Sequence, residues 1–340
     1  DQGLRLTLHI EPPELMRLPW ELLFEEEYIG LRQRFPIVRF LDSPNPPEPV
    51  VLQPPLRVLV AVCPANGTRS PAAEAELTRI RDVLAQMPNK VEVNVLESAS
   101  RDELLAHLRQ GYHVLHYIGQ GMVQGGQGYL VLQDAKARSS QASATLLGHM
   151  TEGRKLRLMV LSPGKSPDRR PGDVLDNVAH SLVRAGIPAV VTMPIAMEDT
   201  AAVAFNRTLY RSLATALPVD VSVQEARRSI LYTQWDSNGM CIYWAIPTLT
   251  MRAHDGVILG IEEEETDMLL RREEIKPTVT FTPTFQGPIY GPVHTGTGRI
   301  QVNTLRYGVN ADELGSLFEA LYRLVDEQAP PDQKQRALQE

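Results

Sequence analysis

Continuous apolar runs alternate with amphipathic segments along most of the chain, and this alternation predicts a layered α/β fold. The runs Leu56–Cys63, His113–Ile118 and Leu156–Leu161 hold few polar residues. Each run therefore predicts a strand that is buried on both faces of a sheet. Segments such as Pro71–Met87 carry apolar residues at helical spacing and predict helices between the strands. Strands separated by helices of this length predict a mostly parallel sheet that is covered on both faces.

Weaker patterns complete the expected order of elements. Alternating residues predict a strand at Leu4–Ile10, another at Val91–Leu96 and a hairpin arm at Tyr129–Gln133. Ser100, followed by Glu103 three residues later, has the spacing of a capping box and predicts a helix that ends at Leu108. The other predictions are strands at Ile37–Phe40, Ala189–Met193 and Trp244–Met251, and helices at Ala142–Met150, Val174–Ala185, Thr200–Ala216 and Val221–Tyr232.

The distribution of charge predicts that the chain has three parts. Residues 1–254 hold 26 acidic and 26 basic residues, whereas residues 255–340 hold 15 acidic and 8 basic residues. The net charge of −7 therefore belongs to the second part. We expect a folded domain over 1–254 and an acidic, extended linker over 255–285. For residues 286–340, the pattern predicts a small C-terminal segment with turns and one amphipathic helix, at Asp312–Val325.

Composition argues against several classes of function. The chain has 43% hydrophobic and 22% charged residues, which is typical of a folded protein. Neither a transmembrane run nor the pattern of a signal peptide is visible. Two cysteines, Cys63 and Cys241, cannot form a disulfide framework, and the eight histidines show no metal-ligand spacing. With balanced charge over 1–254, we expect a cytoplasmic protein that binds no nucleic acid, membrane, metal or cofactor.

Candidate functional residues follow the predicted buried strands. Parallel sheets of this kind bind ligands beyond the carboxyl ends of their strands. The first of these ends is Cys63, the second is Gly119-Gln120-Gly121, and the third is Ser162-Pro163-Gly164-Lys165.

Five segments resemble, in the same order, the motifs of CHAT domains, the caspase-like members of the caspase–separase group of cysteine peptidases. The segments are Leu18–Leu23, His113–Gly121, Leu158–Ser166, Leu182–Val191 and Val219–Ile230. The resemblance covers about residues 3–254. It implies a caspase-like three-layer sandwich with a mostly parallel central sheet. It also implies peptidase chemistry of the C14 type, with a general-base histidine after the second buried strand and a nucleophilic cysteine after the third.

The resemblance places Gln120 at the position of the general base and Gly164 at the position of the nucleophile. A cysteine peptidase needs a thiolate that attacks and an imidazole that activates it, and neither residue supplies one. We therefore predict no catalytic residue and a pseudo-peptidase rather than an enzyme. We expect a protein-interaction or regulatory scaffold in bacterial stress, defence or cell-death-like signalling. Its partner would be a protein or peptide, or an active caspase-like subunit. The predicted cleft residues are Gly119, Gln120, Gly121, Ser162, Pro163, Gly164 and Lys165.

An active cysteine endopeptidase with a displaced nucleophile is the alternative prediction. Cys63 ends a strand that the resemblance places beside the strand of Gln120, about one strand spacing of ~4.8 Å away. The sequence offers this thiol no identifiable base, and its main interpretation is a small buried residue. His116 lies roughly 13 Å below the edge and is interpreted as a hydrogen-bonded core residue. Ser162 lies near the edge, but we expect no histidine placed to activate it. Glu21 is interpreted as a structural anchor.

Overall fold

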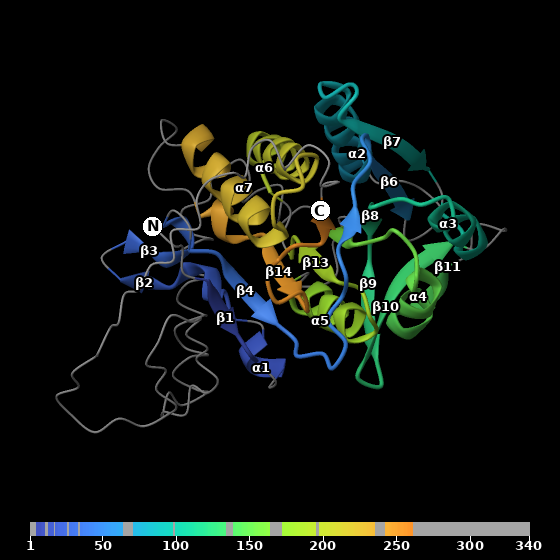
Figure 1. Ribbon diagram of the computed structural model, residues 1–340, viewed down its shortest axis with the longest axis horizontal. Helices are drawn as coiled ribbons and strands as arrows, with labels where there is room; N and C mark the ends of the chain where they lie inside the picture. Colours follow the sequence, from blue (N-terminus) through green and yellow to red (C-terminus); the bar gives the residue numbers. More distant parts are fainter. Residues whose placement is uncertain are drawn as a thin grey trace, which may run out of the picture.

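An eight-stranded sheet forms the centre of the computed structural model, and helices cover both faces of the sheet (Figure 1). The structure describes residues 5–10, 13–16, 18–25, 27–32, 35–63, 71–97, 99–133, 139–163, 172–194, 197–234 and 242–260. The strands of the sheet are β1 (Leu6–Leu8), β4 (Ile37–Phe40), β6 (Leu56–Cys63), β7 (Val91–Leu96), β8 (Val114–Gly119), β12 (Leu158–Pro163), β13 (Ala189–Thr192) and β14 (Thr248–Met251).

The strand order is β1-β4-β14-β13-β12-β8-β6-β7. Neighbouring strands pair in parallel, except that β13 and β14 pair antiparallel. The prediction of an α/β fold with a mostly parallel central sheet between helices is therefore confirmed, and the arrangement is consistent with a caspase-like fold.

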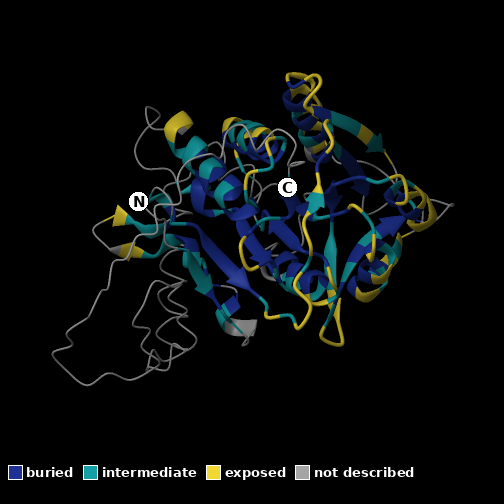
Figure 2. Ribbon diagram, viewed as in Figure 1, coloured by how far each residue is buried: buried dark blue, intermediate teal, exposed yellow. Residues whose placement is uncertain are grey.

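Helices on the two faces enclose two apolar cores. One face carries α2 (Pro71–Ala85), α6 (Asp199–Leu213) and α7 (Val219–Gln234), and the other carries α3 (Arg101–Leu108), α4 (Ala144–Thr151) and α5 (Gly172–Arg184). Successive strand residues point to opposite faces, so Val58 and Val114 pack in the first core while Leu59 and Leu115 pack in the second. The sheet is dark blue throughout its middle in Figure 2, because its strands are buried on both sides.

Smaller elements surround the main sheet. They are the helix α1 (Pro13–Met16), the 3-10 turns η1 (Trp20–Leu22), η2 (Ile29–Leu31) and η3 (Tyr243–Ala245), the hairpin β2 (Phe24–Glu25) and β3 (Glu27–Tyr28), the pair β5 (Val50–Val51) and β15 (Leu259–Gly260), and the antiparallel sheet β9 (Gly121–Gln124), β10 (Gln127–Gln133) and β11 (Ser139–Ser143).

Helix starts follow the local capping chemistry. Ser100 Oγ accepts a hydrogen bond from the Glu103 backbone N–H, and the Glu103 carboxylate accepts one from the Ser100 backbone N–H, each at 3.2 Å. This capping box starts α3, as predicted. Several predicted boundaries differ from the structure, and two of the differences have a local cause. Ala142 belongs to β11, and α4 begins only at Ala144, because Ser143 caps it. The last strand of the sheet begins at Thr248, because the residues from Tyr243 form a 3-10 turn.

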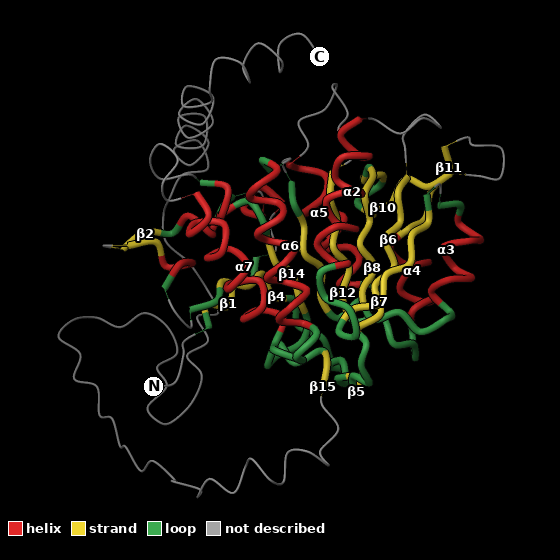
Figure 3. Tube along the Cα trace, turned by 90° about the horizontal axis from the view of Figure 1, so that it is seen from above, coloured by secondary structure: helices red, strands yellow, loops and turns green. Residues whose placement is uncertain are grey.

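The folded part of the chain continues beyond residue 254. Leu259 pairs with Val50, and Ile258 and Leu259 are buried. The pair β5–β15 is labelled at the lower edge of the sheet in Figure 3. Residues 255–260 thus pack on the domain, although the sequence predicts them as linker. The rest of the predicted linker and the segment 286–340, with its predicted helix, lie outside the described residues.

His113, directly before β8, gives the fold a pH-dependent term. Its Nδ1 accepts a hydrogen bond from the Arg57 backbone N–H at 3.0 Å. Burial, together with the cations Lys155, Arg57 and Arg157, lowers the pKa of His113 to about 4. In the unfolded chain, the His113 imidazole binds a proton as the pH falls below ~6.5. In the folded chain, it stays neutral until the pH approaches the lowered pKa. The stabilising contribution of His113 is therefore present above pH ~6.5 and is lost as the pH falls towards the lowered pKa.

We expect the His113→Asn variant to lose less stability than the native chain when the pH is lowered from 7 to 4. The difference should be about 1–2 kcal/mol in the free energy of unfolding, measured by urea titration at each pH. The exposed His149 supplies the control, and His149→Asn should follow the native pH dependence. Parallel curves for the native and His113→Asn chains would contradict the prediction.

Candidate functional site

The carboxyl ends of β6, β8 and β12 meet at one edge of the sheet. Gly119, the last residue of β8, pairs with Cys63 on one side and with Pro163 on the other. Gln120 follows Gly119 directly, so it stands beside the ends of both neighbouring strands. The predicted adjacency of the Cys63 and Gln120 strands is confirmed. These strand ends are the candidate site.

Burial separates the predicted cleft residues of this edge into two groups. Gln120, Gly121 and Pro163 are partly exposed, whereas Gly119 and Ser162 are buried. The surface that the described residues offer at this edge therefore comes from the first group. Gly119 and Ser162, which were both predicted as cleft-lining residues, contribute little exposed surface to it. The remaining two predicted cleft residues, Gly164 and Lys165, lie outside the described residues.

The buried Tyr117 holds the backbone at Gln120. The Tyr117 hydroxyl lies 2.9 Å from the Gln120 carbonyl oxygen and 2.5 Å from the Val131 carbonyl oxygen. The Val131 backbone N–H also donates to the Gln120 carbonyl, at 2.9 Å. Val131 belongs to β10, so the small antiparallel sheet and the main sheet together fix the position of Gln120.

We expect Gly119→Ala to destabilise the chain by about 1–3 kcal/mol through overpacking. A Cβ at Gly119 would lie 2.5 Å from the ring and hydroxyl of Tyr117. This ring cannot move aside without breaking its buried hydrogen bonds. Urea unfolding measures the loss. Gly260→Ala is the control, because a Cβ at Gly260 meets no described atom within 4 Å. Equal stabilities of the two variants would show that Tyr117 gives way freely.

Cys63, the predicted displaced nucleophile, has the properties of a core thiol. It is 2% exposed, and its Sγ lies 3.9 Å from the Ala99 carbonyl oxygen. Burial raises the pKa of Cys63 to about 12, and hydrogen bonds with Ala99 and Tyr117 offset only part of this effect. A thiol with this pKa is protonated at neutral pH and is a poor nucleophile. Neither of these two partners, which both lie in the described part of the chain, can act as its base.

His116 links β8 to β12 and α6 through buried hydrogen bonds. Its Nδ1 lies 2.6 Å from the Tyr210 hydroxyl, and its Nε2 lies 3.3 Å from Ser162 Oγ. Both His116 and Ser162 are fully buried. The interpretation of His116 as a hydrogen-bonded core residue is confirmed. A histidine does lie beside Ser162, because the parallel register places Ser162 next to Ile118 and on the same face as His116.

Burial decides what Ser162 can do. Its Oγ also lies 3.8 Å from Met193 Sδ, and His116 Nε2 lies 3.9 Å from Glu76 Oε1. Either tautomer of His116 satisfies its contacts with Tyr210 and Ser162. Because Ser162 is fully buried, its oxygen does not meet a substrate, and the arrangement links two strands.

Glu21, from the N-terminal motif, lies in a buried group of charges near the other end of the sheet. Its Oε2 is 3.1 Å from Arg39 Nη2, and its Oε1 is 3.3 Å from Arg227 Nη2. Arg39 Nη1 also lies 3.1 Å from Asp176 Oδ2. Burial by itself would lower the pKa of Arg39, but Glu21 and Asp176 raise it above its ordinary value. This geometry agrees with the interpretation of Glu21 as an anchor that ties η1 to β4 and α7.

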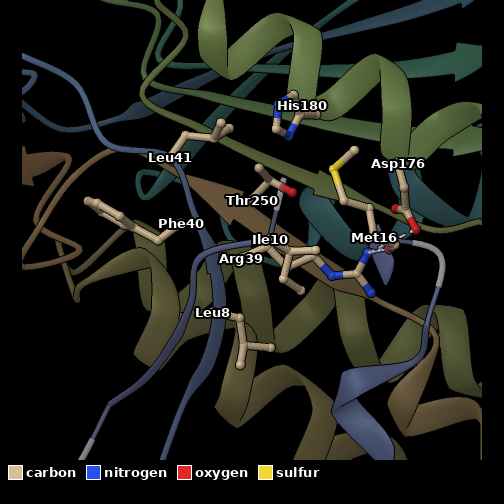
Figure 4. A pocket seen from close by; sticks show the side chains of 9 residues that line it. All are labelled: Leu8, Ile10, Met16, Arg39, Phe40, Leu41, Asp176, His180 and Thr250. Carbon is tan, nitrogen blue, oxygen red and sulfur yellow. Dashed lines mark hydrogen bonds and ion pairs between the residues drawn. The ribbon is translucent and has the colours of Figure 1, made fainter. Parts of the chain in front are cut away.

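A small hollow lies beside these charges (Figure 4). It has room for about one water molecule. In Figure 4, Arg39 points toward Asp176, and His180 comes from the same helix as Asp176. The walls of the hollow are mostly apolar and are formed by Leu8, Ile10, Met16, Arg39, Phe40, Leu41, Asp176, His180 and Thr250. The sequence did not predict this hollow. The sequence feature that could have indicated it is Arg39, a charged residue within the apolar strand β4.

Two general features of the described residues bear on function. No group of histidine, cysteine, aspartate and glutamate side chains among them could hold a metal ion. None of the described helices combines the length and the apolar character that crossing a bilayer requires.

The fold and the strand edge place this chain among caspase-like α/β proteins. Residues 1–252 match the family model of the CHAT domain, and the chain belongs to this family of caspase-like peptidases. A comparison with curated proteins gave no match.

Proposed function

We propose that this chain is a catalytically inactive CHAT domain that binds a protein or peptide and acts as a regulatory scaffold. The observation that carries the proposal is Gln120. It follows β8, where the motif resemblance puts the family's general base, and its amide has no proton that titrates near neutral pH. Gly164, at the position of the family's nucleophile, has no side chain. A cysteine peptidase requires both a thiolate and an imidazole, so the loss of both removes the chemistry.

The chemistry of two neighbouring groups supports inactivity. The alternative, an active peptidase that uses Cys63, requires a thiolate, yet burial raises the pKa of Cys63 to about 12. A serine nucleophile at Ser162 requires access to a substrate, yet Ser162 is fully buried.

Binding does not depend on the dyad. A peptide can be held by backbone hydrogen bonds and by pockets for its side chains, and neither requires a nucleophile or a base. The partly exposed residues Gln120, Gly121 and Pro163 would contact such a peptide. The partner is a protein or peptide, including an active caspase-like subunit, rather than nucleic acid or membrane. The setting that fits such a module is bacterial stress, defence or cell-death-like signalling in the cytoplasm.

The test is a cleavage assay with the purified chain and a library of peptides over a range of pH. We expect no cleavage above the rate in buffer. Gln120→Ala and Gly164→Ala are the matched variants, and both should behave like the native chain. Cleavage by the native chain that either variant abolishes would sink the proposal.

A restoration experiment tests the assignment of the two positions. Gln120→His combined with Gly164→Cys supplies an imidazole and a thiol at the family's positions. We expect an electrophilic peptide probe to label the new cysteine in the double variant and not in Gly164→Cys alone. Labelling of Cys63 instead would favour the displaced nucleophile.

A further inference from the structure

Three aromatic rings lead from the core to the surface near the N-terminal motif. Trp244 is fully buried, and the Tyr28 ring packs on it edge-to-face at 5.0 Å between centroids. The Phe24 ring packs on Tyr28 in the same manner at 5.1 Å. Phe24 is 63% exposed, so the series of rings ends in water. The hairpin β2–β3 that carries it stands out from the body of the molecule in Figures 1 and 2.

Hydrogen bonds hold the hairpin that carries the exposed Phe24 ring in place. The strands β2 and β3 pair with each other, and the Ile29 backbone N–H donates to the Leu23 carbonyl at 2.8 Å. Arg32 Nε bonds Glu27 Oε1 at 3.0 Å, and Gln224 of α7 donates to the Arg32 carbonyl at 2.6 Å. A ring that is held in place in the free protein loses little conformational entropy on binding. Exposed aromatic anchors of this kind supply much of the affinity of protein interfaces.

The charge around Phe24 indicates the chemistry of the partner. The sequence places Glu25, Glu26 and Glu27 directly after the ring, and Arg32 is the cation that contacts Glu27. A partner that covers Phe24 therefore needs an apolar pocket with lysine or arginine at its rim. A second copy of the chain that docked through the same hairpin would bring the same three glutamates. The chain's own residues 255–340, with 15 acidic and 8 basic residues, are also acidic.

We propose that the hairpin β2–β3 is a docking element whose Phe24 ring inserts into a basic-rimmed apolar pocket of a different protein. The hairpin shares no residue with the ends of β6, β8 and β12. This docking therefore goes beyond the proposed function, and its loss leaves the absence of peptidase chemistry unchanged.

The test is a selection from a phage-displayed library of small folded domains with randomised surfaces, with the full chain as bait. We expect the selected domains to carry lysine and arginine around an apolar centre. Their affinity should fall by about tenfold or more with Phe24→Ser, and it should weaken as salt is added.

Tyr232→Ser is the matched control, because Tyr232 is 64% exposed and lies on α7 rather than on the hairpin. It should leave the affinity unchanged, and both variants should keep a cooperative unfolding transition in urea. The proposal is overturned if no domain is selected, if the selected domains bind Phe24→Ser as well as the native chain, or if they lack basic residues. Dimerisation of the chain in sedimentation that Phe24→Ser abolishes would assign the hairpin to a second copy instead.

Discussion

Replacement of Glu21 by alanine should destabilise the folded chain by about 3–5 kcal/mol, because it leaves buried guanidinium groups without their shared carboxylate. Arg227 is 1% exposed and Arg39 is 6% exposed. In the variant, Arg39 still has its ion pair with Asp176. Arg227 loses the charge of Glu21, which in the native chain raises the pKa of Arg227 against the lowering effect of burial. A loss of this size is a large fraction of the stability of a typical domain.

Urea unfolding followed by circular dichroism measures the effect. Glu27→Ala is the control, since Glu27 forms an exposed ion pair with Arg32 at 3.0 Å, and such pairs contribute less than about 1 kcal/mol. Glu21→Gln keeps the size of the side chain but removes its charge, and it should fall between the two. A loss for Glu21→Ala that is no larger than the loss for Glu27→Ala would show that the buried charges are compensated in another way.

Cys63 should react with a neutral thiol reagent roughly a thousandfold more slowly in the folded chain than in the urea-unfolded chain at pH 8. The thiolate is the reactive form, and burial raises the pKa of Cys63 to about 12, from an ordinary value near ~8.5. As long as the pH is below this pKa, the rate in the folded chain should rise about tenfold for each unit by which the pH is raised. The same shift makes the fold less stable at alkaline pH, because the unfolded thiol ionises first.

Peptide mapping by mass spectrometry separates the label on Cys63 from the label on Cys241, which lies outside the described residues. Cys241→Ser provides a chain with Cys63 alone and should show the same slow reaction. Rapid labelling of Cys63 in the folded chain, together with peptide cleavage that Cys63→Ala removes, would establish the displaced nucleophile and reject the inactive domain.

Local patterns were enough to predict the class of fold. Strands such as Leu56–Cys63 are buried on both faces, so all but one of the residues of this strand are apolar, and the pattern is visible without knowledge of its neighbours. The capping box at Ser100 also depends only on residues within one helical turn. The motifs of the strand ends placed Gln120 at the sheet edge for the same reason, because each is continuous in the chain.

The tertiary structure alone decided which polar groups meet. His116 and Ser162 are 46 residues apart, and Glu21 and Arg227 are 206 residues apart. The spacing of residues within one element shows whether a side chain is buried. The partner of a buried polar group depends instead on the order and register of strands, and on which helix covers which face. The sequence therefore determined the layers of this protein and the residues that follow its strand ends, while only the packed sheet decided the contacts of Glu21 and the contact of His116 with Ser162.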